Sequence, residues 1–231
     1  MSPNAPIVLV HALDLEGAPW HAALVGGARR GRRVDGTIAG LPVAIVRCGI
    51  GKVAAALATA ETIAASGARA VVVAGSAGSL ASGVRVGDLV LATETIQHDL
   101  GVREGRVVAA STELRAAIAK AARGSFRNGE RLHEGAVLTG DRACLSYRRR
   151  LRLRVAFRTS RPLAVEMEGA AVAAAAAAAG VPHAVVRVAT DRAGPLGALE
   201  FRRNAQRLGG RAAEAVVAWL KEGARGCRSI S

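Results

Sequence analysis

The chain has 231 residues, of which 51% are hydrophobic and only 3% aromatic, and its 32 lysines and arginines exceed its 18 acidic residues to give a net charge of +14. This apolar fraction supplies a full hydrophobic core and excludes an intrinsically disordered chain. The apolar runs are far shorter than the roughly 18 residues of a membrane span, and no basic residue precedes the first of them. We therefore expect no transmembrane helix, no secretory signal and no membrane partner.

Short apolar runs alternate with longer helical patterns along the chain. In chain order, the patterns predict strands at 6–13 and 43–48, a helix at 53–65, strands at 70–74 and 88–93, a helix at 112–123, strands at 137–139 and 164–167, a helix at 169–179, a strand at 183–190 and a helix at 199–223. Unbroken runs of valine, isoleucine and leucine between helices are typical of a parallel sheet covered on both faces. With no linker or repeat, residues 1–231 are predicted to form one α/β domain, with three α/β/α layers around a central mixed, largely parallel sheet. The arginine-rich stretch at 148–154 is expected to be a solvated helix face.

The positive charge has two explanations. A basic surface attracts polyanions such as nucleic acids. However, lysine occurs only at Lys52, Lys120 and Lys221, so 29 of the 32 basic residues are arginine, and alanine is abundant. A GC-rich genome produces this bias, and the scarcity of aromatic residues argues against stacking on single strands. We therefore favour compositional bias and expect no specific nucleic-acid partner.

The three cysteines, Cys48, Cys144 and Cys227, are widely spaced and odd in number. This pattern predicts neither a disulfide framework nor a CxxC metal site. We expect a protein of the reducing cytoplasm with no bound metal.

Polar groups follow or interrupt four of the predicted strands. They are Asp14 with Glu16, the Gly-Ser-Ala-Gly segment at 75–78, Glu166 with Glu168, and Asp191. In an open α/β sheet, ligands bind at the carboxyl ends of the strands, and carboxylates within apolar sequence are costly unless they are paired or functional. A helix cap or a surface position explains one such acid alone, but their recurrence at one edge of the sheet predicts a binding site.

Two glycine-containing segments and one charge in a strand need separate explanations. The segment at 75–78 allows close backbone approach and offers a hydroxyl, which suits an anion, a water or a base edge. It lacks the lysine of a Walker loop and the glycine spacing of a dinucleotide-binding turn. The Gly-Ile-Gly-Lys segment at 49–52 is explained by a tight turn at a helix start. For Arg187, in mid-strand, a salt bridge to Glu166 is favoured over contact with a ligand.

Seven short segments, spread over nearly the whole chain, together form a recognisable series of motifs. They are CGIGKVAAAL at 48–57, AGSAG at 74–78, VGDLV at 86–90, TETIQHD at 93–99, TGD at 139–141, AVEMEGAAVA at 164–173 and VVRVATD at 185–191. In this order they resemble the nucleoside phosphorylase superfamily, and most closely its methylthioadenosine/S-adenosylhomocysteine nucleosidases.

The resemblance implies a purine nucleoside N-glycosidase. Asp191 matches the general acid that protonates the purine at N7, and Glu16 matches the acid that orients and activates the attacking water. The substrate-binding positions that match are Ser76 and Gly78 for the water and the base, Cys144 for backbone pairing with the purine, Met167 beneath the sugar, Glu168 for the ribose hydroxyls, Phe201 as a lining aromatic, and Ile50. Such chemistry passes through an oxocarbenium-like state and needs a proton donor, a carboxylate near the sugar and a placed nucleophile. No cofactor is expected.

The nucleophile is expected to be water. A phosphorylase must hold a phosphate dianion, usually with arginines. The phosphate-binding branch of the family has arginine where this chain has Glu16, and again where it has Val73 and Ala74. Arg47 and the arginine cluster at 29–33 keep a phosphate-dependent phosphorylase open as the alternative, because a neighbouring subunit can donate an arginine.

Three departures from the nucleosidase pattern leave the substrate open. Arg142 and Ala143 stand where an aromatic residue usually stacks on adenine, the segment at 100–106 is short, and no second aspartate follows Asp191. A nucleosidase for bulkier 5′-substituted nucleosides, of the futalosine or adenosylhopane type, is therefore an alternative. A basic nucleic-acid-binding module on a retired enzyme fold is an alternative of another class, which the retention of Glu16, Glu168 and Asp191 disfavours. The resemblance implies a homo-oligomer, with a dimer favoured.

Overall fold

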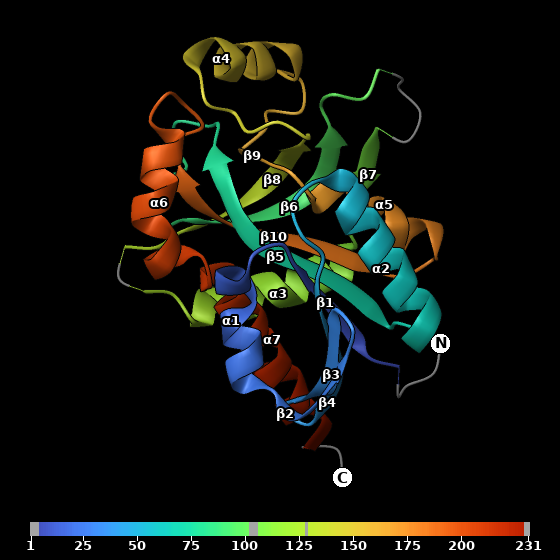
Figure 1. Ribbon diagram of the computed structural model, residues 1–231. Coiled ribbons are helices and arrows are strands. Elements are labelled where there is room, and N and C mark those ends of the chain that lie inside the picture. Colours follow the sequence, from blue (N-terminus) through green and yellow to red (C-terminus); the bar gives the residue numbers. More distant parts are fainter. Residues whose placement is uncertain (1–4, 102–105, 128, 229–231) are drawn as a thin grey trace.

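The computed structural model describes residues 5–101, 106–127 and 129–228. Its strands are β1 (Ile7–His11), β2 (Val25–Arg30), β3 (Arg33–Ile38), β4 (Leu41–Arg47), β5 (Ala70–Ser79), β6 (Leu89–Gln97), β7 (Val107–Ala109), β8 (Leu132–Thr139), β9 (Ala164–Glu166) and β10 (His183–Asp191). Its helices are α1 (Asp14–Ala23), α2 (Lys52–Ser66), α3 (Thr112–Gly124), α4 (Tyr147–Ala156), α5 (Gly169–Ala178), α6 (Gly197–Leu208) and α7 (Arg211–Arg228). The predicted α/β class is confirmed (Figure 1).

The described strands form one mixed sheet in the order β10–β6–β8–β9–β5–β1–β4–β3–β2, with β7 beside β6. Parallel pairs join β1 to β4 and β5, β5 to β10, and β8 to β6 and β9. The other pairs, including β10 with β6 and β5 with β9, are antiparallel. Because β5 also pairs with β10, strands β5, β9, β8, β6 and β10 form a closed ring of pairings.

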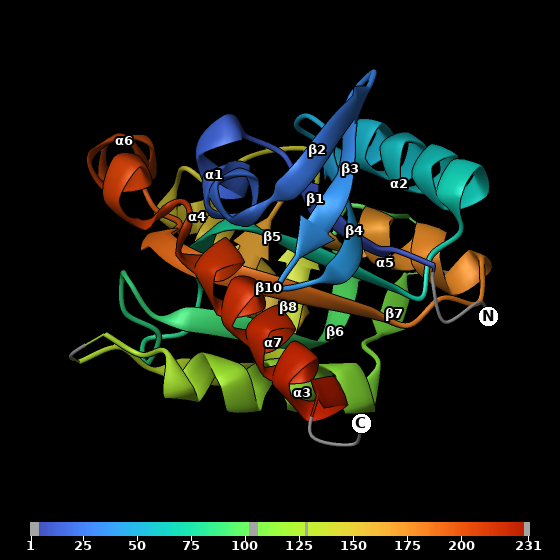
Figure 2. The same ribbon diagram turned by 90° about the horizontal axis from the view of Figure 1, so that it is seen from below.

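Alternate residues of the central strands face different helical layers. In β1, Ile7 and Leu9 join a core cluster that includes residues of α1, α3 and α7, whereas Val8 and Val10 join a cluster with α2 and α5. Successive side chains of a strand point to opposite faces, so a strand covered on both faces is apolar at every position. Figure 2 shows α3 and α7 together below the strands, and α2 and α5 together at the upper right.

Helix α1 and the hairpin strands β2 and β3 were not predicted, for different physical reasons. Helix α1 contains Gly17 and Pro19, both of which disfavour a helix, but its fully buried Trp20 donates an indole hydrogen bond of 3.1 Å to the carbonyl of Ala213 in α7. Tertiary packing therefore overrides local propensity. The hairpin strand β2 has every residue exposed, so it lacks the apolar alternation that predicts a strand.

The single terminal helix predicted at 199–223 is wrong, because Gly209 and Gly210 separate α6 from α7. A Cβ at Gly209 would lie 1.9 Å from Leu15 Cδ1, and one at Gly210 would lie 2.7 Å from Pro19 Cγ. Helix α1 thus packs directly against the backbone of the break, where no side chain fits.

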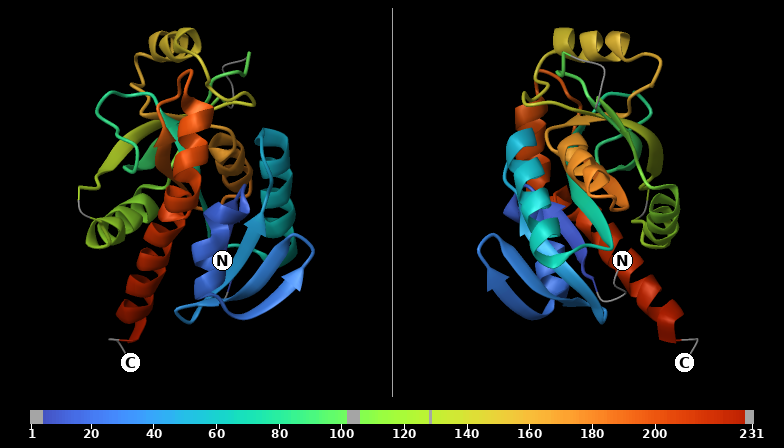
Figure 3. Two further views of the ribbon diagram at one scale, coloured as in Figure 1. Left: turned by 60° about the vertical axis from the view of Figure 1, so that its left-hand side comes forward. Right: turned by 90° about the vertical axis from the view of Figure 1, so that its right-hand side faces the viewer.

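The Gly-Ser-Ala-Gly segment, expected after its strand, lies inside the strand. β5 continues to Ser79 because β10 pairs along one side, up to Asp191 opposite Gly78, and β9 pairs along the other side. The carboxyl ends of β1, β5 and β10 consequently meet at one end of the molecule. In Figure 3 this end carries α4 and lies opposite the C-terminus.

Candidate active site

All of the residues predicted to form the site line one cavity of about 310 Å³. They are Glu16, Ile50, Ser76, Gly78, Cys144, Met167, Glu168, Asp191 and Phe201. They come from α1, the turn before α2, β5, the loop before α4, the turn before α5, the end of β10, and α6. Residues distant in sequence thus meet where the central strands end.

The Glu16 carboxylate is fixed by backbone donors. It is 4% exposed and accepts N–H groups from Ala12 (3.2 Å), Leu13 (3.0 Å) and Ser76 (2.8 Å). A carboxylate offers about four acceptor positions, so these three bonds set its orientation and leave one position for a ligand such as water.

A buried arginine holds the neighbouring acids. Arg187 is 1% exposed, and its Nη2 donates to Glu166 Oε2, which confirms the predicted salt bridge. Glu166 also accepts the hydroxyl of Thr139 and the N–H groups of Glu168 (2.9 Å) and Gly169 (2.8 Å). Breaking such a buried pair by removing one partner typically costs about 3–5 kcal/mol.

Glu168 lies at the edge of this network. Its Oε1 accepts the N–H of Gly51 at 2.9 Å, and its Oε2 lies 4.0 Å from Arg187 Nη2. Burial raises the pKa of Glu168 to about 7, and the negative charge of Glu166 adds to the rise, while Arg187 and the Gly51 N–H oppose it. The Glu168 carboxyl therefore changes its charge near neutral pH.

Gly51 explains the Gly-Ile-Gly-Lys segment. Its φ of 96° lies in the region that favours glycine, and α2 begins at the next residue. The predicted tight turn at a helix start is confirmed, and the turn also supplies the donor to Glu168.

Asp191 is the last residue of β10, and its carboxyl accepts two hydrogen bonds. Its Oδ1 accepts the Ala193 N–H at 2.8 Å, and its Oδ2 accepts the Thr190 hydroxyl at 3.1 Å. Burial raises the pKa of Asp191, and these two bonds oppose the rise. A carboxyl that retains its proton more readily than usual suits a general acid.

Two glycines of β5 make room for these acids. A Cβ at Gly75 would lie 2.6 Å from Arg187 Nη1 and 2.8 Å from Glu16 Oε1, and one at Gly78 would lie 2.7 Å from Asp191 Oδ1. The charged groups thus reach the site only because the strand backbone carries no side chain there.

The rest of the cavity is mostly apolar. The Ser76 hydroxyl is buried and has no hydrogen-bond partner among the described residues, so it is free to bind a ligand. Burial raises the pKa of Cys144, so its thiol stays neutral. Sequence reasoning missed a set of small and apolar lining residues, namely Ala12, Leu13, Leu145, Val165, Ala193, Gly197 and Ala198. Their proximity in sequence to Glu16, Cys144, Glu166, Asp191 and Phe201 was the signal that could have revealed them.

Within the described residues, no three His, Cys, Asp or Glu side chains are grouped so as to hold a metal ion. The helices of the same part of the chain include none that is long and apolar enough to cross a membrane. Cys48 and Cys144 are free thiols, and the side chain of Cys227 lies outside the described side chains. Residues 102–105 of the short segment noted above also lie outside the description.

Comparison with known proteins settles the family. A family model described as the phosphorylase superfamily matches residues 6–221. The chain belongs to the phosphorylase superfamily. A 5′-methylthioadenosine/S-adenosylhomocysteine nucleosidase of Shewanella frigidimarina is 31% identical over 223 residues, which cover 93% of this chain and 94% of the relative. A nucleosidase of the same name from Shewanella denitrificans is 34% identical over 198 residues, covering 82% and 85%.

Solved structures of this superfamily share the fold. The methylthioadenosine/S-adenosylhomocysteine nucleosidase of Neisseria meningitidis, in complex with methylthio-immucillin-A, has a TM-score of 0.88 at 28% identity and covers 94% of this chain and 99% of its own. Futalosine hydrolase of Helicobacter pylori has a TM-score of 0.86 at 26% identity, covering 95% and 98%. The predicted superfamily and mixed α/β fold are confirmed.

Proposed function

We propose that this member of the phosphorylase superfamily is a nucleosidase that hydrolyses the N-glycosidic bond of a 5′-modified adenosine, such as methylthioadenosine or S-adenosylhomocysteine. The observation that carries the proposal is the convergence of Glu16, Glu168 and Asp191 on one cavity. The names of the relatives and of the structural neighbours support the same substrate class.

The proposed reaction begins at the base. Asp191 donates its proton to N7 of the purine, so the electron pair of the glycosidic bond leaves with a neutral base. Glu168 binds the ribose hydroxyls while positive charge develops on the sugar. A water held by Glu16 attacks C1′ and gives its proton to that carboxylate.

Water is favoured over phosphate because of the charges that line the cavity. Arg187 already neutralises Glu166, and Asp191 carries a proton in the proposed reaction. Glu16 is thus the carboxylate that meets the nucleophile, and Arg142 is the one guanidinium among the described lining residues. A carboxylate in this position repels a phosphate dianion. Three of the arginines considered for phosphate are also engaged elsewhere: Arg47 lies 3.1 Å from Asp14, and Arg30 and Arg33 contact Asp35.

Nucleoside turnover with and without phosphate tests this chemistry. We expect equal adenine release in the two buffers and a free 5′-modified ribose as the second product, read by chromatography. Strict dependence on phosphate, with a sugar 1-phosphate as product, would replace hydrolysis by phosphorolysis.

A bulkier 5′ group remains the second candidate. Leu145 lines the cavity yet is 48% exposed, and Leu196, which precedes the lining residue Gly197 in sequence, is 61% exposed, so apolar side chains continue to the surface. A futalosine hydrolase is among the structural neighbours. A substrate panel separates the candidates: methylthioadenosine turning over no better than nucleosides with larger 5′ groups would favour this second substrate class.

A cytoplasmic homodimer completes the proposal. The family resemblance supports it, and α2 with the preceding turn exposes Ile50, Val53 and Leu57 at 61%, 72% and 55%. Light scattering of the purified chain gives the oligomeric state directly, and a monomeric mass would contradict the dimer.

A further inference from the structure

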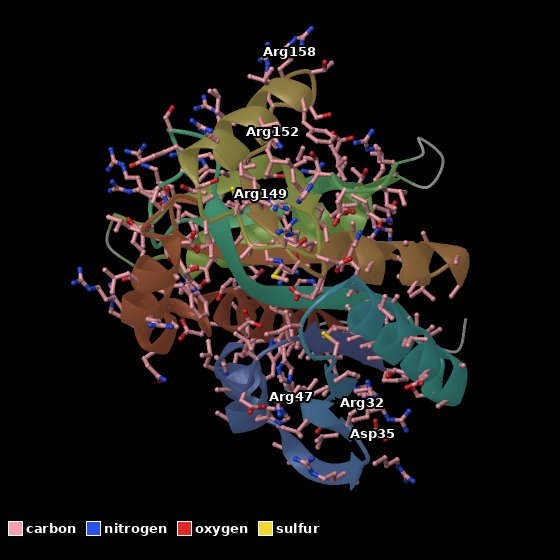
Figure 4. The ribbon with its side chains drawn as sticks, turned by 45° about the horizontal axis from the view of Figure 1, so that its top comes forward. Arg32, Asp35, Arg47, Arg149, Arg152 and Arg158 are labelled. Carbon is pink, nitrogen blue, oxygen red and sulfur yellow. The ribbon has the colours of Figure 1, made fainter. Side chains whose placement is uncertain are left out.

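Helix α4 stands out from the rest of the surface by its charge. Between Asp141 and Glu166 the chain has eight arginines and no acidic residue. The ion pairs among the described residues involve none of the α4 arginines, although arginines elsewhere pair with Asp35, Glu134 and Glu214. In Figure 4, Arg152 and the following Arg158 project from the α4 end of the molecule, far from Arg32 on the hairpin. This end is therefore a concentrated, unneutralised cationic surface.

The same helix carries an exposed apolar stripe. Tyr147, Leu151 and Val155 are 69%, 62% and 54% exposed and are spaced four residues apart, which places them on one face. Arg148, Arg152 and Arg154 flank this stripe and are also exposed. Aliphatic side chains surrounded by arginines, all directed away from the protein, are not explained by packing within the fold.

Helix α4 is anchored by its opposite side. Leu153 is 6% exposed and joins a core cluster with Leu80, Leu138 and Val165. The Arg150 guanidinium donates a 3.1 Å hydrogen bond to the Leu80 carbonyl, and the Ser146 hydroxyl caps the helix by accepting the Arg149 N–H. The outer face is thus presented by a fixed helix.

We propose that the outer face of α4 docks on an anionic lipid surface, with Leu151 and Val155 inserted among the lipid headgroups and the flanking arginines paired with lipid phosphates. Anionic headgroups attract clusters of basic residues, and exposed aliphatic side chains beside such a cluster gain apolar contact when they enter the headgroup boundary. The expectation of no membrane partner rested on the lack of a spanning helix, which peripheral docking does not require.

Other occupants fit this face less well. A nucleic-acid backbone pairs with the arginines but leaves Leu151 and Val155 without apolar contact. A second copy brings the same arginines together in a chain with a net charge of +14, so like charges oppose that contact. An anionic lipid layer matches both the charge and the apolar stripe.

Helix α4, the proposed docking surface, lies close to the rim of the cavity. Leu145, which lines the cavity, lies two residues before α4, and the Tyr147 ring lies 3.7 Å from where a Cβ of Gly194 would be. A docked α4 consequently brings the rim of the cavity close to the lipid surface.

Vesicle co-sedimentation of the full chain tests the proposal. We expect binding to vesicles of phosphatidylcholine mixed with phosphatidylglycerol, little binding to phosphatidylcholine alone, and weaker binding as salt is raised. The Leu151→Ser, Val155→Ser double variant keeps every arginine, and we expect it to lose about tenfold or more in partitioning to the anionic vesicles. The Arg148→Gln, Arg152→Gln double variant is expected to lose binding to a similar extent.

The matched control is Arg29→Gln with Arg32→Gln, which removes the same charge from the hairpin and is expected to bind like the parent. Unaltered circular dichroism and nucleoside turnover in buffer show that the α4 variants are folded. Three results would overturn the proposal: equal loss in the hairpin control, anionic-vesicle binding unchanged by the two serine substitutions, or a change of oligomeric state as their main effect. Binding of duplex DNA that depends on α4, without vesicle binding, would assign the face to nucleic acid instead. Since vesicle binding is measured without substrate, failure here leaves the proposed nucleosidase reaction intact.

Discussion

Asp191 is the general acid of the proposed reaction. Its carboxyl is held by Ala193 and Thr190, and burial raises its pKa. Replacing Asp191 with Asn keeps the shape but removes the proton, so we expect turnover to fall about a hundredfold or more. The measurement is adenine release under saturating substrate.

The control for this substitution is Asp14→Asn, since Asp14 is also acidic but 77% exposed and paired with Arg47. We expect it to retain near-parental turnover. Parental turnover in Asp191→Asn would remove Asp191 from the acid role.

Glu168 makes a prediction about pH and stability. Its pKa is about 7 in the folded protein against an ordinary 4.5, so folding favours the protonated form. That stabilisation is complete below pH 4.5 and is lost as the pH rises through about 7, which is a loss on the order of 3 kcal/mol. Glu168→Gln has no such titration, so the stability of the parent relative to this variant should decline across this range.

Denaturant unfolding at pH 4.5 and pH 8 measures the difference. The exposed Glu113→Gln serves as control and should show no comparable change between the two pH values. A parent that gains stability relative to Glu168→Gln as pH rises would contradict the raised pKa.

Among the elements, β5 shows how a strand can serve a site. Gly75 lies between the buried Arg187 guanidinium and the buried Glu16 carboxylate, which are held by their bonds to Glu166 and to the Ser76 N–H. Gly75→Ala should therefore cost about 1–3 kcal/mol through overpacking, measured by thermal or denaturant unfolding. Gly83→Ala, where an added Cβ meets nothing within 4 Å, should be nearly neutral. Equal stabilities of the two variants would show that the crowding at Gly75 is relieved without cost.

The predictability of an element depended on where its apolar residues are. β1, β4, β5 and β10 were predicted because they are buried on both faces, so their sequences are unbroken apolar runs. The fully exposed β2 carries no such pattern. The break at Gly209 depends on the approach of Leu15 from a distant helix, which no local pattern encodes.

Some features of the site were likewise predictable from the sequence and others were not. The strand-end position of the acids and the family resemblance identified which residues line the cavity. Of the three N–H donors to Glu16, Ala12 and Leu13 are local neighbours at the start of α1. The donor from Ser76 could not be predicted, because it depends on how β1 and β5 are placed side by side. The pairing of Arg187 with Glu166 was predictable, since a charge within a buried strand requires a counter-charge.

For the whole molecule, the excess of positive charge predicts a response to salt. With 32 basic residues against 18 acidic ones, repulsion between like charges opposes the compact state. Adding sodium chloride screens this repulsion, so the melting temperature should rise from low to moderate ionic strength. A melting temperature that falls over that range would show that screened ion pairs outweigh the repulsion.

The ring of strand pairings has a consequence during synthesis. β5, β9, β8 and β6 all leave the ribosome before β10, the last strand in chain order. Until β10 emerges, the nascent chain lacks Arg187 as counter-ion for Glu166, and burying that acid alone is unfavourable. The candidate pocket is therefore assembled late in translation, and a chain that stalls before β10 leaves the ring open and its strand edges exposed to aggregation.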